Sequence, residues 1–199
     1  MEIITGMIQS TRYRTAQSTL KISIMWAVVS IVSATAVLIL LTTTHNPRFN
    51  AAWLAIPVLG FPLNILMLKG AHKETYVRTF IDTIRDNVWR TVSYLGVGLT
   101  VVCAVFNILY TTKAWMVMFF YAFIVVGFGA AMQGFIMREK SYTIGGVFSI
   151  VCGFVLMAAA LCGLPLLVVW VLPLYILCFL LMFVIPGAIV MRRIKHENN

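Results

Sequence analysis

Long apolar stretches, separated by short clusters of charged residues, are the main pattern of this chain. The stretch 141–191 contains no Asp, Glu, Lys or Arg at all. A membrane-crossing helix needs roughly 20 apolar residues to span about 30 Å of hydrocarbon. Six stretches reach about this length, so we expect six transmembrane helices, at 22–41, 51–68, 91–110, 114–137, 142–161 and 166–191.

Helices are favoured over barrel strands because the apolar stretches are continuous. Strands of a membrane barrel alternate apolar and polar residues over about 10 positions, and none of the six stretches does so. Only 11% of the residues are charged, against about 25% in soluble domains. The sequence therefore predicts an all-α, polytopic membrane protein with a single six-helix transmembrane domain over 1–199.

Two further segments show helical periodicity outside these stretches. Residues 2–18 carry apolar side chains on one helical face, and the loop after the second stretch repeats this pattern through Val77, Phe80, Ile81, Ile84 and Val88. Helices of this kind lie in the membrane interface. We expect two interfacial amphipathic helices, and the second can run unbroken into the third span.

The polar face of this second segment carries an alternating row of charges. Arg78, Asp82, Asp86 and Arg90 follow one another at i, i+4 spacing, and Arg85 lies among them. Such spacing allows the ion pairs Arg78–Asp82 and Asp86–Arg90, each worth a few tenths of a kcal/mol when exposed. We take these five residues as a candidate cytoplasmic interaction face.

The basic residues behind the net charge of +9 are distributed unequally between the two sides of the predicted membrane. If both termini and the second and fourth loops share one side, that side holds all but two of the 15 Lys and Arg residues, the exceptions being Arg48 and Lys113. The positive-inside rule puts the basic side in the cytoplasm. We expect both termini to be cytoplasmic and the basic residues to attract anionic lipid head groups. The charge then needs no nucleic-acid partner.

Residues for chemistry are scarce inside the predicted spans. All six carboxylates fall outside them, so proton-coupled transport and intramembrane proteolysis are disfavoured. The four cysteines have no CxxC spacing and no neighbouring histidine. Asp82 and Asp86 could hold a divalent cation with His72 or Glu74, but a solvated, arginine-paired face is the simpler interpretation. We expect no enzyme activity, cofactor or metal.

Three amides are the polar candidates within the spans. Asn64 and Gln133 fall at similar depth toward the cytoplasm, and Asn107 falls near the outer end of the third span. A hydrogen bond between Asn64 and Gln133 would be a bundle contact of about 0.6 to 2 kcal/mol. Alternatively, these amides line a polar cavity open to the cytoplasm.

Small residues and prolines predict how the helices pack. Gly127, Ala131 and Gly134 form a small-xxx-small row that suits close helix contact, as do Gly145, Ser149 and Gly153 on the next span. Prolines at 57, 62 and 173 predict kinks or bends in the second and sixth spans.

The whole chain resembles a family of small six-span bacterial inner-membrane proteins whose activity is uncharacterised. The resemblance rests on an amphipathic start ending in Thr11-Arg12, on Asn46-Pro47 leading to Pro62-Leu63, on Gly145-Gly146 and on Ile185-Pro186-Gly187. It implies topology and compartment, and it supplies no catalytic residues.

Two functions remain open at this stage. The first is a non-enzymatic inner-membrane protein that acts through its cytoplasmic face on a protein or lipid partner, or on a second copy of itself. The alternative is a small-molecule transporter or channel with a cavity near Asn64 and Gln133, with helices broken by proline around it.

Overall fold

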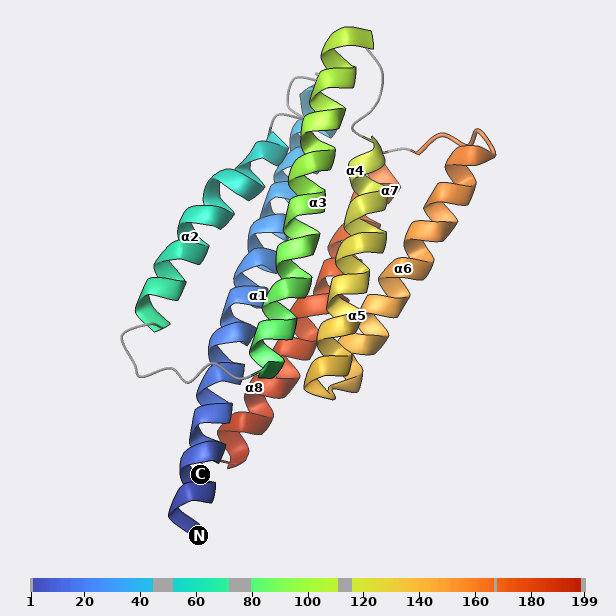
Figure 1. The fold of residues 1–199 in the computed structure, drawn as a ribbon. Helices are drawn as coiled ribbons and strands as arrows, with labels where there is room; N and C mark the ends of the chain where they lie inside the picture. Colours follow the sequence, from blue (N-terminus) through green and yellow to red (C-terminus); the bar gives the residue numbers. More distant parts are fainter. Residues whose placement is uncertain (1, 45–51, 72–79, 111–115, 167, 198–199) are drawn as a thin grey trace. The chain divides into compact units, whose positions relative to one another are not determined.

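The computed structural model describes residues 2–44, 52–71, 80–110, 116–166 and 168–197. Within these ranges the chain is helical apart from the turns at 138–139 and 162–166, and it has no strands (Figure 1). In chain order the elements are α1 (Glu2–Thr44), α2 (Ala55–Ala71), α3 (Phe80–Tyr110), α4 (Met116–Phe120), η2 (Tyr121–Val125), α5 (Val126–Met137), α6 (Lys140–Leu161), α7 (Val168–Phe179), η3 (Leu180–Val184) and α8 (Ile185–Glu197). The elements η2 and η3 are single π-helical turns, each joined directly to the helices before and after it.

Five helical stretches among the described residues are long and apolar enough to cross a membrane. They are Leu20–Thr44, Phe80–Phe106, Met116–Met137, Lys140–Leu161 and Val169–Arg193. A multi-pass membrane protein is therefore indicated. The expected second span is a shorter apolar helix, Ala52–Met67. The expected six crossings thus correspond to five long helices and one short one.

The helix boundaries differ from the expected ones at two places. α1 is one helix of 43 residues, so the expected N-terminal segment 2–18 is continuous with the first span rather than a separate helix. α3 begins at Phe80, and the amphipathic segment runs unbroken into the third span. The candidate span Phe80–Phe106 consequently includes Asp82 and Asp86, which the sequence pattern assigned to a loop.

The chain divides into two compact units, one formed by residues 1–78 and 172–199 and the other by residues 79–171. Each unit has its own helix contacts, which are described separately below. A single bundle formed by all six spans remains a prediction.

In the first unit, α2 packs against α1 and α8 packs against α1 (Figure 1). The start of α1 and the end of α8 lie at the same end of this unit. Gly60 makes the α1–α2 contact possible, because a Cβ on it would lie 2.2 Å from the ring of Trp26. Trp26 also meets the edge of Phe61 at 5.6 Å between ring centroids. This edge-to-face arrangement is a favoured one for aromatic pairs.

The prolines do not break the helices where the sequence suggested. Pro62 and Pro173 lie inside the continuous helices α2 and α7. The irregularity in the last span is instead η3, where the N–H of Ile185 bonds the carbonyl of Leu180, one residue further back than in an α-helix. Pro186 follows directly and has no N–H to donate. The π turn therefore lies beside Pro186, a proline at which the sequence analysis predicted no kink.

In the second unit, α5 lies between α3 and α6. Gly129 faces Trp89 and Val92 of α3, whereas Gly134 faces Thr143 of α6. Of the predicted small residues, Gly127 lies against Ser149 of α6, whereas Gly153 faces η2 instead of α5. Gly146, which the predicted row did not include, lies directly against Ala131. The hydroxyl of Ser149 donates a 2.9 Å hydrogen bond to the carbonyl of Phe123 within η2, so a buried hydroxyl is satisfied at the π turn.

Similar turns end α5 and α6. After α5, Glu139 N–H bonds Gly134 and Arg138 N–H bonds Phe135; after α6, Leu164 bonds Ala159 and Gly163 bonds Ala160. Both are Schellman motifs, in which one residue takes a left-handed conformation. Gly163 has a φ of 75° and Arg138 a φ of 56°. Arginine tolerates this conformation less well than glycine, but it keeps a positive charge beside the helix end.

Replacing Gly146 by Ala should destabilise the second unit. The new Cβ would lie 2.5 Å from the backbone nitrogen of Ala131 and 2.6 Å from the carbonyl oxygen of Gly127. Backbone atoms cannot rotate away, so α5 and α6 must separate, at a cost of about 1–3 kcal/mol. Unfolding of the purified protein in detergent measures this cost. Gly98→Ala is the matched control, because nothing lies within 4 Å of its Cβ position; equal losses from both variants would contradict the close contact.

Candidate polar site on the packed face of α3

One face of α3 is buried and carries two charged residues of the second unit, Asp82 and Arg85. Asp82, Arg85, Val92 and Cys103 are buried on it, and their spacing of three, seven and eleven residues keeps them on a common helical face. On the other side, the start of α3 is exposed and apolar at Phe80, Ile81 and Ile84. The sequence pattern expected the charged face to be solvated, and the structure instead buries Asp82 and Arg85.

The guanidinium of Arg85 joins two carboxylates. Its Nη1 lies 3.1 Å from Oδ1 of Asp82, and its Nη2 lies 3.0 Å from Oδ1 of Asp86. The Asp82 side chain is 5% exposed and the Asp86 side chain 36% exposed. Burying a charge is tolerated only when it is paired and hydrogen-bonded, so the Asp82–Arg85 pair is the one on which local stability depends.

One turn further along the same face, the Trp89 indole N–H donates a 2.8 Å hydrogen bond to Oε1 of Gln133 on α5. Gln133 is completely buried. The bond fixes which end of the amide faces α3, and Nε2 has no acceptor among the described residues. The Trp89–Gln133 bond therefore ties α3 to α5 and leaves a buried amide N–H without a described partner.

The contacts between α3 and α5 also give the depth of the charged residues. Trp89 lies beside Gln133 and Val92 beside Gly129, so the two helices run antiparallel. Four residues before Trp89, Arg85 comes level with Met137, the last residue of α5. The start of α3 and the turn after α5 lie at the same end of this unit (Figure 1). From Met116 to Met137 the helix is about 33 Å long, close to the hydrocarbon thickness. If Met116–Met137 spans the hydrocarbon, Arg85 lies at the membrane interface and not at the midplane.

Arg85 is an ion-pair partner that the sequence pattern did not select. It bonds both Asp82 and Asp86, whereas the pattern paired Asp82 with Arg78 and Asp86 with Arg90, and the Arg78–Asp82 pair stays a prediction. Arg78 lies outside the described residues, and Arg90 is exposed on α3.

The three candidate amides do not form a common site. Gln133 has Trp89 as its described partner, whereas Asn64 is half-buried on α2, in the other unit. An Asn64–Gln133 contact joins the two units and stays a prediction. Asn107 lies on α3, and its side chain is outside those described.

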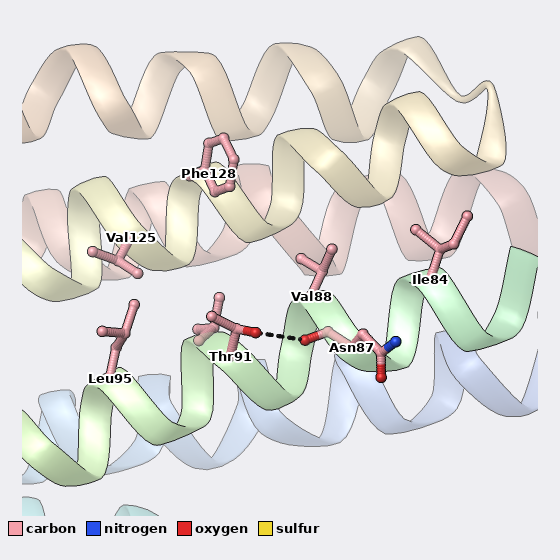
Figure 2. A pocket seen from close by; sticks show the side chains of 8 residues that line it. Ile84, Asn87, Val88, Thr91, Leu95, Val125 and Phe128 are labelled. Carbon is pink, nitrogen blue, oxygen red and sulfur yellow. Dashed lines mark hydrogen bonds between the residues drawn. The ribbon is translucent and has the colours of Figure 1, made fainter.

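A groove of about 370 Å³ lies on the second unit between α3 and the η2–α5 segment (Figure 2). Its walls include Val88 and Leu95 of α3 with Val125 and Phe128 across from them. Neither Asn64 nor Gln133 lines this groove, so it is not the transport cavity that the sequence suggested near those amides.

The site's chemistry is that of paired charges and of one buried amide, Gln133, whose Nε2 has no described partner. No group of three His, Cys, Asp or Glu residues that could hold a metal occurs among the described residues. The arrangement fixes the orientation of α3 at the interface. The i, i+3 spacing of Asp82 and Arg85 in the sequence is compatible with their ion pair. The same charge pattern also allowed pairs with Arg78 and Arg90, so it did not single out Arg85.

Removing the charge of Arg85 should destabilise the protein far more than removing that of Arg90. Arg85→Gln leaves the buried Asp82 carboxylate without its described cation, which costs about 3 kcal/mol for a buried pair. Arg90→Gln makes the same chemical change at an exposed position and should shift stability by less than about 0.5 kcal/mol. Detergent unfolding of both variants checks this; similar losses would mean that Asp82 does not depend on Arg85.

Comparison of the chain with protein-family models, with curated proteins and with solved structures gives no match. The resemblance to small six-span inner-membrane proteins accordingly remains a prediction from the sequence motifs.

Proposed function

We propose that this chain is a non-enzymatic, six-span protein of the bacterial inner membrane that acts by binding a protein or lipid partner at its cytoplasmic face. Both termini are cytoplasmic in this proposal. On the cytoplasmic side of this proposal the first unit has the start of α1 and the end of α8. The second unit has the start of α3, with Thr83 and Asn87 as exposed positions.

The length of α1 is the observation that carries this proposal. The helix has 43 residues, and its candidate span uses only Leu20–Thr44. The preceding 18 residues are helical and extend about 27 Å. They include Arg12 and Arg14. A rigid basic helix beyond the span is suited to binding a partner or an anionic surface.

The end of α8 supports the same assignment of sides. Arg192 and Arg193 end the last candidate span and Lys195 follows it, and α8 ends where α1 begins in the first unit (Figure 1). Basic residues at both helix ends agree with the positive-inside rule. An even number of crossings requires α2 to span, and its short apolar stretch is compatible with local thinning of the bilayer.

Photo-cross-linking in cells tests the proposal. A photoreactive amino acid at Gln9 on α1 or at Thr83 on α3 should capture a discrete protein or lipid adduct. The same amino acid at Leu164, an exposed position in the turn after α6, should not capture it, because this turn belongs to the opposite side. Equal capture at all three positions, or export of a reporter fused after Asn199, would contradict the proposal.

A further inference from the structure

The groove between α3 and η2–α5 has the shape and lining for a hydrocarbon chain. Val125 and Leu95 point toward one another across it (Figure 2). Leu95 and Phe128 are each about half exposed, at 54% and 53%. The polar lining residues are Asn87 and Thr91, and the Thr91 hydroxyl already donates a 2.9 Å hydrogen bond to the carbonyl of Asn87. The walls therefore offer apolar surface without an unsatisfied hydroxyl.

The groove also has a direction relative to the membrane. It runs along α3 from Ile84 to Leu95, a rise of about 16 Å. Its first end is next to Arg85, which lies at the interface, and its second end lies deeper. An acyl chain entering from the head-group layer follows the same path. Asn87, exposed at the first end, is an amide at the depth of the lipid's polar part.

Arg90 supplies a positive charge beside this path. It lies three residues after Asn87, hence on a neighbouring part of the helix surface, and it is exposed. Helical side chains lean toward the N-terminus of their helix, and for α3 this is the interface end. A long Arg side chain can therefore extend its guanidinium to the phosphate layer. Arg85 is less suited, because both nearby carboxylates bond it.

We infer that this groove binds an anionic phospholipid, with an acyl chain between α3 and η2–α5 and the head-group phosphate at Arg90 and Asn87. The inference deepens the proposed function, because it names a lipid class and a site for it on the same face. It separates two roles on one helix: Arg85 neutralises carboxylates, and Arg90 binds the ligand.

Native mass spectrometry of the full-length protein in detergent, titrated with dioleoyl phosphatidylglycerol or dioleoyl phosphatidylcholine, tests this inference. The two lipids share their acyl chains and differ in head-group charge. Arg90→Gln should weaken phosphatidylglycerol binding about fivefold, the effect of one cation at a membrane surface, and should weaken phosphatidylcholine binding less, because the choline cation offsets the charge of the same phosphate. Lys140→Gln, at an exposed cation on α6, is the charge control.

Filling the groove with a larger side chain tests independently whether the groove binds an acyl chain. Leu95→Trp should reduce binding of both lipids, whereas Ile144→Trp on the exposed face of α6 should reduce neither. The inference is overturned if Lys140→Gln acts as strongly as Arg90→Gln, since attraction is then diffuse, or if Leu95→Trp has no more effect than Ile144→Trp. If the lipid result fails while Gln9 and Thr83 still capture a partner in cells, the proposed function stands without this site.

Discussion

Hydrocarbon offers no hydrogen-bond partner, so a polar atom inside a membrane helix needs a partner within the protein. This constraint accounts for most of the side-chain contacts described here. Thr42, Thr43 and Thr44 each donate to a carbonyl four residues earlier on α1. The Tyr121 hydroxyl bonds the backbone carbonyl of Val92 on a neighbouring helix, whereas the buried Tyr142 hydroxyl has no hydrogen-bond partner among the described residues. The contacts that join α3, α5 and α6 thus satisfy polar groups and position helices at once.

The π turn η2 shows the same constraint acting on the backbone. A π turn shifts the carbonyl ladder by one residue, and the hydroxyl of Ser149 bonds the Phe123 carbonyl within it. Beside it, Gly96 leaves room for the Tyr121 hydroxyl, since a Cβ there would lie 2.5 Å from that oxygen. One irregular turn is therefore held by α6 on one side and by α3 on the other.

The lengths of the apolar stretches predicted most of the helices. Placing a charge in hydrocarbon costs much free energy, so charged residues mark the ends of the spans along the sequence. The start of α3 is helical, as predicted, but its charged face was expected to be solvated. Asp82 and Arg85 are instead buried, because each compensates the charge of the other. Gln133 was selected as a polar residue within a span, and it bonds a side chain of another helix. Its partner Trp89 is 44 residues distant, and tryptophan gave no signal of a donor role. The two π turns have no sequence signature that distinguishes them from the surrounding apolar helix.

The continuity of α1 has a mechanical consequence. A helix without a hinge behaves as a stiff rod over tens of ångströms, so the segment beyond the span and the span itself must tilt together. A partner bound near Glu2 would apply force to α1 about 27 Å beyond the span. The resulting tilt of α1 would be transmitted to α2 through the contact of Trp26 with Gly60. Engagement at the membrane surface is in this way coupled to helix tilt inside the bilayer, with no flexible joint to absorb it.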